Sequence, residues 1–390
     1  MVKYNCLNPI AQCGLEKFPE GYEKTESFAD ADVALVRSAA MHDMEFSDNL
    51  KAIARAGAGV NNIPLEECAK KGIVVFNTPG ANANGVKELV IAALILASRD
   101  IVGGINWVTD NKDDENLAKS VEKAKKAFAG TEIQGKKLGV IGLGAIGVLV
   151  ANAANRLGME VYGCDPFISV DSAWNLSRDI KHVKTREEIF KECDYITVHT
   201  PLLDDTKHMI NKDTISMMKD GVIILNFARG ELVDDDAIIE AVKSGKVRKY
   251  MTDLPNCKIA GVPGIVAVPH LGASTQESED NCALMAVNEI TDFMENGNIK
   301  NSVNYPACNA GVCQTEGRIA INHKNIPNML AVFANAFAKK SMNIENMVNK
   351  ARGEYAYTVI DTNDLSEDIT KVIENHEGVI KARIIAKIVF

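Results

Sequence analysis

Short runs of apolar residues, broken by polar and glycine-rich segments, fill the first part of the chain. Three of them, each ending near Gly, Ser, Asn or Pro, read ADVALVRS, LKAIARAGAGV and GIVVFNTPG. Helical patterns separate these runs, so we expect a small parallel α/β layer. The stretch GVKELVIAALILASRDIVGGINWV then predicts one long helix with an apolar face, and DNKDDENLAKSVEKAKKAF predicts a solvated connection or helix. We place a crossing between two domains there.

From Lys136 onward, apolar runs follow one another and most of them end in a polar residue. The runs are KLGVIG, MEVYGCD, DYITVH, GVIILN, KYMTD and GIVAVPH, and the polar residues that end the last five are Asp165, His199, Asn226, Asp253 and His270. Ligands of an open parallel sheet bind outside the carboxyl ends of its strands. We therefore expect these side chains to face one crevice.

The last part of the chain has a different pattern. A helix is predicted over STQESEDNCALMAVNEITDFMENG, and residues 304–315 have the composition of a turn-rich linker. The segments after it predict the order β-α-β-β-α-β, with MVNKARGEYAYTVI supplying strands between. They are RIAINHKNIPNML, a helical run to about Met342, AYTVIDTN, DITKVIENHEGVI and KARIIA. A third, small domain is predicted to close the chain.

Composition narrows the class of protein. At 390 residues the chain predicts two or three domains, and its net charge of −9 argues against nucleic acid as a partner. The nine cysteines form no C-x-x-C pair, so we expect neither a disulfide framework nor a metal site. The amino terminus lacks a signal-peptide pattern, and the best apolar run, residues 89–97, is too short to cross a bilayer. We expect a cytoplasmic protein with no membrane partner.

The segment GLGAIG contains a glycine motif, Gly142, Gly144 and Gly147, between a predicted strand and a predicted helix. In this context the first glycine permits a tight turn, the second lets backbone N–H groups approach a pyrophosphate, and the third packs helix on strand. Asp165 ends the next strand roughly twenty residues on, where a carboxylate binds ribose hydroxyls and repels a 2′-phosphate. The motif favours NAD over NADP; the alternative is a glycine turn used only for packing.

Three further residues are candidates for chemistry. His270 ends a predicted strand on the cofactor edge, where an imidazole accepts the hydroxyl proton as hydride leaves a secondary alcohol; the alternative is a structural histidine. Arg229 suits bidentate binding of a 2-hydroxy- or 2-keto-carboxylate; the alternative is a surface salt bridge. His199 more readily lines the cofactor site than carries chemistry.

With these residues in place, residues 1–305 resemble the D-isomer-specific 2-hydroxyacid dehydrogenases. The segments that carry the resemblance are VRSA, LKAIARAGAGVNNI, NTPGANANGVKELV, GKKLGVIGLGAIG, HTPLLDDTKHMI, NFARGELVDDDAI and PHLGAST. Within that family the chain resembles the D-3-phosphoglycerate dehydrogenases that carry a C-terminal ACT domain. The resemblance implies an α/β fold: a doubly wound Rossmann NAD domain (99–279) inserted in a flavodoxin-like substrate domain (1–98 and 280–305), plus a C-terminal ferredoxin-like ACT domain (316–390).

The resemblance also implies roles for individual residues. Arg229 and His270 are the catalytic pair. Substrate contacts are expected from Arg37, which reaches toward a phosphate, and from Ser38, Arg55, Gly57, Gly59 and Asn82. The NAD site is expected to comprise Gly142, Gly144, Ala145, Ile146, Gly147, Asp165, His199, Thr200, Pro201, Ala228, Asp253 and Gly272. An L-serine effector would contact His323, Asn325 and Asn343.

Two positions depart from the family pattern. Lys258 stands where a glutamate normally hydrogen-bonds the catalytic histidine. Either Asp253 or Glu277 supplies the carboxylate, or the histidine works without one, or catalysis has been lost; we favour a working histidine with an activity profile that extends to lower pH. Asn328 replaces a glycine of the effector motif, so an ACT domain that only mediates assembly is an equal alternative.

The activity implied is NAD-dependent oxidation of 3-phosphoglycerate to 3-phosphohydroxypyruvate, the first step of serine biosynthesis, by a homodimer or homotetramer. A hydroxypyruvate or glyoxylate reductase is the close alternative, with a small 2-hydroxy acid as substrate. A non-catalytic, NAD-sensing regulator similar to the C-terminal-binding-protein co-repressors is an alternative of another class.

Overall fold

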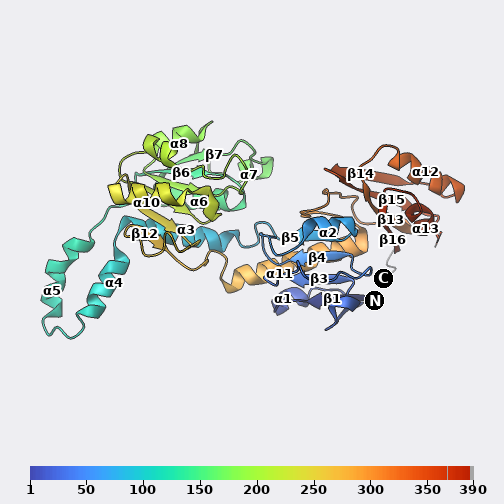
Figure 1. Cartoon of the computed structure of the whole chain (residues 1–390), viewed down its shortest axis with the longest axis horizontal. Coiled ribbons are helices and arrows are strands. Elements are labelled where there is room, and N and C mark those ends of the chain that lie inside the picture. Colours follow the sequence, from blue (N-terminus) through green and yellow to red (C-terminus); the bar gives the residue numbers. More distant parts are fainter. Residues whose placement is uncertain (367, 387–390) are drawn as a thin grey trace. The chain divides into compact units, whose positions relative to one another are not determined.

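The computed structural model describes residues 1–366 and 368–386. The chain divides into two compact units, one built from residues 1–82 and 276–390 and the other from residues 83–275 (Figure 1). Residues 83–98 belong to the second unit and residues 276–279 to the first, so the units divide the chain at slightly different positions from the predicted domains. Residues 367 and 387–390 of the predicted ACT domain lie outside the described residues.

The first unit contains the parallel layer that the opening pattern predicts. Its five strands lie in the order β2-β1-β3-β4-β5 and pair in parallel throughout. They are β1 (Val2–Cys6), β2 (Tyr22–Lys24), β3 (Val33–Val36), β4 (Ala52–Arg55) and β5 (Val74–Asn77), accompanied by α1 (Gln12–Leu15), η1 (Phe28–Asp30), α2 (Leu65–Lys70) and α11 (Gln276–Asn296). Apolar residues of β3, β4 and β5 are fully buried, which explains their continuous apolar runs.

The second unit is a doubly wound α/β domain with a seven-stranded parallel sheet in the order β12-β11-β10-β9-β6-β7-β8. Chain order reverses between β6 and β9, which makes that boundary the topological switch point where such sheets bind ligands. The strands are β6 (Lys137–Ile141), β7 (Glu160–Cys164), β8 (Lys181–His182), β9 (Tyr195–Val198), β10 (Val222–Asn226), β11 (Val247–Thr252) and β12 (Ile265–Ala267). The helices that connect them are α6 (Ala145–Arg156), α7 (Val170–Trp174), α8 (Arg186–Glu192), α9 (Lys212–Met217), η3 (Gly230–Leu232) and α10 (Asp235–Ser244).

The single long helix predicted after residue 83 is wrong, because the chain forms α3 (Ala83–Ser98) and then α4 (Ile101–Asp110). Asp100 starts the second helix by accepting a hydrogen bond from the Gly103 N–H at 3.1 Å. The charged stretch after it is helical, with α5 (Leu117–Ala124) and η2 (Lys125–Phe128). Together α4 and α5 form a hairpin that stands out from this unit (Figure 1).

The C-terminal part of the first unit confirms the predicted β-α-β-β-α-β order. Its elements are β13 (Gly317–Lys324), α12 (Met329–Lys339), β14 (Asn346–Arg352), β15 (Tyr355–Thr362), α13 (Ile369–Glu374) and β16 (Val379–Ala386). The four strands form an antiparallel sheet in the order β14-β15-β13-β16. This is the layout expected for an ACT-like domain.

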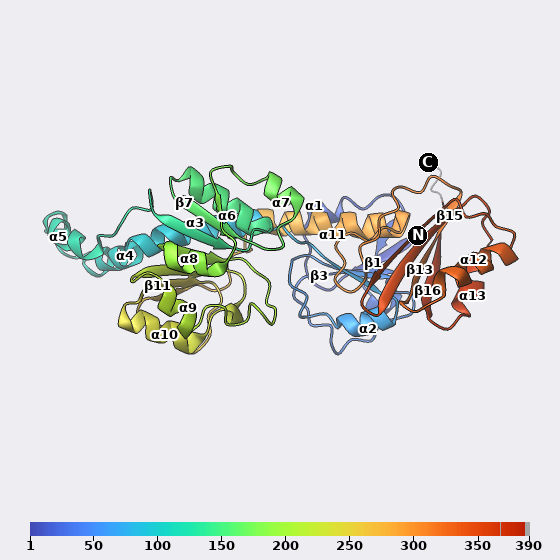
Figure 2. The same ribbon diagram turned by 90° about the horizontal axis from the view of Figure 1, so that it is seen from above.

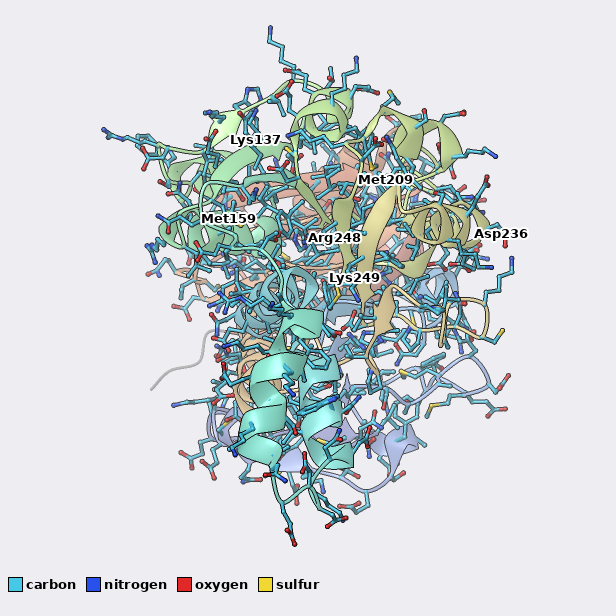
Figure 3. The ribbon with its side chains drawn as sticks, turned by 90° about the vertical axis from the view of Figure 1, so that its left-hand side faces the viewer. Lys137, Met159, Met209, Asp236, Arg248 and Lys249 are labelled. Carbon is cyan, nitrogen blue, oxygen red and sulfur yellow. The ribbon has the colours of Figure 1, made fainter. Side chains whose placement is uncertain are left out.

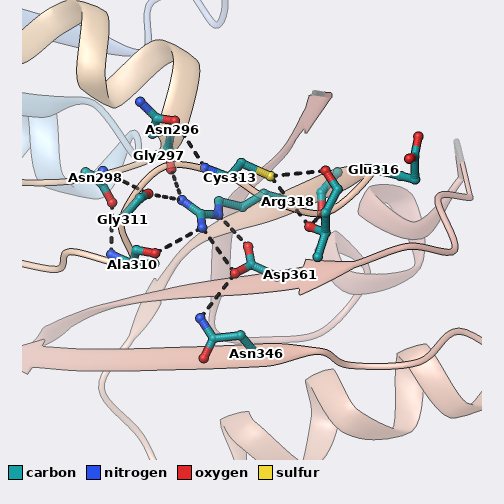
Figure 4. A network of polar contacts seen from close by, with 12 residues as sticks. Asn296, Gly297, Asn298, Ala310, Gly311, Cys313, Glu316, Arg318, Asn346 and Asp361 are labelled. Atoms are coloured by element: carbon teal, nitrogen blue, oxygen red, sulfur yellow. Dashed lines mark hydrogen bonds and ion pairs between the residues drawn. The ribbon is translucent and has the colours of Figure 1, made fainter. Parts of the chain in front are cut away.

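The C-terminal sheet packs against the end of α11 (Figure 2). Arg318 is fully buried, pairs with Asp361, and donates to the carbonyl oxygens of Asn296 at 2.6 Å and Gly311 at 2.8 Å (Figure 4). The Arg383 guanidinium lies 4.2 Å from the ring centroid of Phe293 in the last turn of the helix. Arg383, which is half-buried, also donates from Nη1 to the Met294 carbonyl oxygen at 3.1 Å. The two arginines thus supply donors to carbonyl groups in the last turn of the helix, which ties the C-terminal sheet to the substrate-side layer.

Two smaller findings concern the whole described chain. Within residues 1–366 and 368–386, no helix combines the length and apolar character that a membrane crossing requires. All nine cysteines are free thiols, as their spacing predicts.

Candidate active site

The glycine turn between β6 and α6 is dictated by close backbone contacts. Gly142 has φ +92°, and a Cβ there would lie 2.7 Å from the carbonyl oxygen of His199 at the end of β9. A Cβ at Gly147 would lie 1.9 Å from the carbonyl oxygen of Gly142. Neither position accepts a side chain without movement of backbone, so these two glycines are needed for the turn itself.

Gly144 differs from the other two glycines of the motif. A Cβ at this position would meet no protein atom within 4 Å. Gly144 caps α6, a helix of 12 residues, with no side-chain hydrogen bond. The space before the helix is therefore open, and the free N–H groups of its first turn are donors that suit a pyrophosphate.

Asp165 follows β7 and is held beside this turn. Its Oδ2 accepts the N–H of Leu143 at 2.8 Å, and its Oδ1 accepts the N–H of Phe167 at 2.8 Å. Each carboxylate oxygen keeps a lone pair for a further donor, such as a ribose hydroxyl. The negative charge at this position opposes a 2′-phosphate.

Two buried polar atoms of the second unit lack partners among the described residues: Nδ1 of His199 and Oδ1 of Asp253. His199 Nε2 lies 2.9 Å from Thr197 Oγ1, and burial lowers the pKa of the imidazole to about 4, which keeps it neutral. Asp253 is 2% exposed and accepts the Gly272 N–H at 2.8 Å through Oδ2. The open atoms fit a bound dinucleotide, whose carboxamide and hydroxyl groups donate hydrogen bonds.

Arg229 lies on the loop after β10, with an exposed side chain. Its Nη1 donates to the carbonyl oxygen of Ala228 at 2.7 Å, and no carboxylate pairs with it in the part of the chain that the structure describes. Asn226, fully buried, donates from Nδ2 to the Arg229 carbonyl oxygen at 2.8 Å and accepts the Ala228 N–H at 3.1 Å. Asn226 received no role from the sequence beyond ending a strand, yet it positions the arginine loop.

His270 lies in a loop and not at a strand end, because β12 stops at Ala267. Its φ of +36° is unusual for a residue with a side chain, and its backbone N–H donates to the Asp253 carbonyl oxygen at 2.9 Å. The imidazole is exposed and has no hydrogen-bond partner within the described residues. Strained backbone at a residue of this type is a frequent feature of functional sites.

The carboxyl edge of the first sheet gathers the residues expected to bind substrate. The N–H groups of Arg37 and Ser38, after β3, both donate to Asn8 Oδ1, at 2.9 and 3.0 Å. Arg55, which ends β4, donates from Nε to the Arg37 carbonyl oxygen at 3.1 Å. Two arginines with adjacent backbones therefore lie at this edge.

The glycine loop after β4 is fixed by contacts with the neighbouring strand. Gly57 has φ +148°, a Cβ there would lie 2.1 Å from Arg55 Nη1, and its N–H donates to Thr78 Oγ1 at 2.7 Å. Gly59 lies on the same loop. Asn82 is the last residue of the unit's first segment, immediately before α3.

An acidic residue of α11 reaches the first of these arginines. Glu279 Oε1 lies 2.7 Å from Arg37 Nη2, with the two side chains about equally exposed. The sequence analysis did not single out Glu279, because more than 240 residues separate it from Arg37 and no local pattern links them.

Residues 91–272 match the family model described as the D-isomer specific 2-hydroxyacid dehydrogenase, NAD binding domain. A hydroxypyruvate reductase from Thermotoga maritima is 37% identical over 291 residues, which cover 71% of this chain and 90% of that protein. The chain belongs to the D-isomer specific 2-hydroxyacid dehydrogenase family. Its second unit therefore contains the NAD-binding domain of the family.

Other members of the family extend the comparison. A D-3-phosphoglycerate dehydrogenase from Methanocaldococcus jannaschii is 35% identical over 293 residues, 73% of this chain, and the chain spans only about half (54%) of that protein's length. One from Haemophilus influenzae is 29% identical over 386 residues, covering 95% of this chain and 90% of its own length. The NAD⁺-bound 3-phosphoglycerate dehydrogenase structure from Entamoeba histolytica superposes with a TM-score of 0.61 and 30% identity, over 78% of this chain and 98% of that one.

Lys258, at the position of the family glutamate, turns to an aspartate of α10. Its Nζ lies 3.1 Å from Oδ2 of Asp236, which projects from the helix toward solvent (Figure 3), and this contact raises the pKa of the lysine. The Asp253 carboxylate bonds Gly272 instead of the His270 imidazole. Asp253 is therefore not a hydrogen-bond partner of the histidine within the described residues, and a role for Glu277 stays a prediction.

A cavity of about 820 Å³ in the second unit adjoins the family histidine. Its walls include His270 and Asp253, and its other acidic residues are Glu231, Asp234, Asp235 and Asp236. These four acidic side chains come from the segment ARGELVDDD. Carboxylates therefore line the cavity although a lysine stands at the position of the family glutamate.

The residues predicted to bind serine in the C-terminal domain are engaged within the protein. His323 is buried, with Nδ1 2.8 Å from the Lys324 carbonyl oxygen and Nε2 2.8 Å from Thr358 Oγ1, and burial lowers the pKa of its imidazole. Asn325 donates to the Gly353 carbonyl oxygen and Asn343 to a carboxylate oxygen of Glu345. An effector that used these side chains would have to replace internal hydrogen bonds, and the serine site stays a prediction.

Asn328 explains how the chain accommodates its departure from the family glycine. It has φ +75°, in the left-handed region, and starts α12. Asparagine adopts this conformation at lower cost than most residues, so the backbone turn is kept while a side chain is added.

Proposed function

We propose that the chain is an NAD-dependent 2-hydroxyacid dehydrogenase that oxidises 3-phosphoglycerate to 3-phosphohydroxypyruvate, the first step of serine biosynthesis. The observation that carries the phosphorylated substrate is the pair of arginines, Arg37 and Arg55, at the carboxyl edge of the first sheet. Guanidinium groups bind phosphate through several directed hydrogen bonds. Phosphoglycerate dehydrogenases among the relatives support the same choice.

The proposed roles in the second unit follow from which groups are free. Arg229 pairs with no carboxylate in residues 1–366 and 368–386, so its guanidinium is available to bind the substrate carboxylate and polarise the adjacent carbon–oxygen bond. His270, whose imidazole has no partner in the described part of the chain, accepts the proton of the 2-hydroxyl group. NAD bound at the glycine turn supplies the hydride acceptor.

The histidine is proposed to work without the family carboxylate. A neutral imidazole is the form that accepts a proton, and an imidazole that no carboxylate hydrogen-bonds loses its own proton at lower pH than one in a histidine–glutamate pair. Alcohol oxidation should therefore persist to lower pH than in an enzyme with the histidine–glutamate pair. A histidine-dependent limb of the pH–rate profile above about pH 8 would contradict this proposal.

A hydroxypyruvate or glyoxylate reductase is the second candidate, and one observation favours it. Glu279 lies against Arg37 and offsets the charge that a substrate phosphate would use. The relative from Thermotoga maritima carries the name hydroxypyruvate reductase. An unphosphorylated 2-keto acid has no need of that arginine.

The experiment that separates the candidates follows NADH oxidation with 3-phosphohydroxypyruvate, hydroxypyruvate and 2-oxoglutarate. For the first candidate, Arg37→Ala should weaken turnover of the phosphorylated keto acid alone, while Arg178→Ala, an exposed arginine of the second unit, serves as the control. Equal loss for the unphosphorylated acids would reject the phosphate role of Arg37. Tight binding of NADH without turnover of any acid would instead favour the regulatory alternative.

A homo-oligomer is proposed on the strength of an exposed apolar surface. Val102, Ile105 and Val108 of α4 are 50%, 59% and 45% exposed. Apolar side chains grouped on one exposed helix are typical of an interaction surface. Light scattering of the intact protein tests whether it is a dimer or a tetramer.

A further inference from the structure

A second cavity lies in the first unit, along α11 and the segment that follows it. It has a volume of about 480 Å³ and is lined by six residues of the helix together with Asn298, Lys300 and Asn301. None of the lining residues has been assigned to substrate, NAD or serine. Its volume falls in the range of sites that hold small molecules.

The chemically unusual residue of this cavity is Glu289. Its side chain is only 6% exposed, and its Oε1 accepts a hydrogen bond from Asn301 Nδ2 at 2.5 Å. Its Oε2 has no partner among the described residues. Burial raises the pKa of this carboxyl group to about 7. A buried acceptor left open in this way is costly, and a ligand that donates to it relieves the cost.

The other charged groups of the cavity define what such a ligand must carry. Asp292, from the same face of the helix, already accepts hydrogen bonds from Asn296 and Asn298 through Oδ1. Lys300, at the exposed rim, is the one positively charged residue of the described chain that lines the cavity. The walls thus carry two carboxyl groups and one ammonium, so a positively charged ligand suits them better than an anion. No group of three or more metal-ligating side chains occurs in the described residues, which points away from a metal ion.

We propose that this cavity binds a small organic ammonium ion, which donates N–H groups to Glu289 Oε2 and lies close to Asp292. The side-chain amides of the lining asparagines supply hydrogen bonds for a hydroxyl group on the same ligand. The positive charge of Lys300 repels a cation, and it repels one of higher charge more strongly. The cavity should therefore prefer a monoamine to an inorganic cation of higher charge.

A short chain of hydrogen bonds links this cavity to the glycine loop of the first sheet. Asn301, which holds Glu289, accepts the Asn77 N–H at 3.2 Å through its carbonyl oxygen. Asn77 in turn donates from Nδ2 to the Ala58 carbonyl oxygen at 2.7 Å. An occupied cavity should therefore hold the loop of Gly57 and Gly59 more firmly and change the affinity for substrate; this consequence alone rests on the proposed function.

The test of binding is calorimetric titration of the intact protein with ethanolamine, an ammonium ion at neutral pH, with ethylene glycol as its neutral counterpart. Ethanolamine should bind and ethylene glycol should not. Binding should be stronger at about pH 8 than at about pH 6, because Glu289 is ionised at the higher pH. This comparison uses the unaltered protein, so it needs no turnover and no variant.

Two substitutions then give opposite expectations. Glu289→Gln should weaken ethanolamine binding at least tenfold, whereas Lys300→Gln should strengthen it by removing a like charge. Glu20→Gln, an exposed glutamate of the same unit, should leave binding unchanged, and circular dichroism establishes that each variant is folded. Absence of ethanolamine binding to the unaltered protein, or equal loss in the Glu289 and Lys300 variants, would overturn the proposal.

The coupling is tested separately. Ethanolamine at a saturating level should change KM for the keto acid in the unaltered enzyme and leave it unchanged in Glu289→Gln. Calorimetric binding with no change in KM would remove the coupling and keep the site. Absence of any turnover would count against the proposed function and not against ammonium binding.

Discussion

The carboxyl edges of the two parallel sheets differ in how completely their polar groups are satisfied. At the edge of the second unit, Asp253 and His199 each leave a buried atom without a partner among the described residues, and no carboxylate of those residues pairs with Arg229. At the edge of the first unit, Arg37 is already paired with Glu279. In the proposed function, the groups for the cofactor and the substrate carboxylate are therefore unpaired before a ligand binds, whereas a substrate phosphate would have to compete with Glu279 for Arg37.

The largest effect is expected from replacing His270, the proposed proton acceptor at the carboxyl edge of the second unit's sheet. His270→Ala should lower kcat/KM for keto-acid reduction by roughly 10²–10⁴-fold, because the group that transfers the proton is removed. NADH binding, measured by fluorescence, should remain. Lys258→Met serves as the control, since its ammonium pairs with Asp236, and it should retain most of the activity. Similar losses in both variants would show that the lysine takes part in the chemistry.

A large effect on stability is expected from Glu289, beneath the first-unit edge. A carboxyl pKa raised from 4.5 to about 7 means that the folded state binds the proton more tightly than the unfolded state. The free energy of unfolding should therefore fall as pH rises through this interval, by about 3 kcal/mol in total.

The comparison with Glu289→Gln isolates this contribution. The variant is neutral throughout, so its stability relative to the unaltered protein should rise between pH 4.5 and about pH 7 and stay constant above that range. Urea unfolding at a series of pH values measures the difference. A difference independent of pH would mean that Glu289 is ionised throughout this range in the folded protein.

The glycine motif allows a sharper dissection of the second-unit edge. Gly147→Ala places a Cβ against the Gly142 carbonyl oxygen and should destabilise the fold by about 1–3 kcal/mol as well as weaken NADH binding. Gly144→Ala meets no protein atom and should weaken NADH binding with little change in Tm. Thermal unfolding and NADH fluorescence distinguish the two, and a lowered Tm for Gly144→Ala would argue against an open cofactor space.

The smallest expected effect lies at the first-unit edge. Glu279→Gln removes the charge that competes for Arg37 and should lower KM for 3-phosphohydroxypyruvate by roughly fivefold, corresponding to about 1 kcal/mol. KM for hydroxypyruvate should not change. An equal change for both acids would indicate that Glu279 acts on the fold and not on phosphate binding.

Much of the fold follows from local patterns. Apolar runs predicted β3, β4 and β5 of the first sheet and all strands of the second sheet except the two-residue β8, and the C-terminal order was also predicted, because each depends on residues close in sequence. No run predicted β1 or β2. The break between α3 and α4 was missed, since a single capping residue, Asp100, outweighs a continuous apolar face. The extra length assigned to the last strand of the second sheet was wrong because the chain leaves the ladder after Ala267.

Site residues that lie close together in one sequence motif could be predicted from the sequence. Contacts between segments that are distant in the sequence could not. The glycine turn and Asp165 are close in sequence and interact as expected through the Leu143 N–H. The Arg37–Glu279 pair and the Glu289–Asn301 contact depend on how α11 packs, which no spacing rule reveals. Asn226 was visible as a polar strand end, but its hydrogen bonds to the arginine loop required the structure.

The most direct test of the central claim, a working histidine without its usual glutamate, is NADH oxidation by the purified protein with 3-phosphohydroxypyruvate. The account predicts turnover that strongly prefers this acid over hydroxypyruvate and that His270→Ala abolishes. Tight NADH binding with no turnover of either acid would contradict it and would mean that Lys258 marks a lost active site.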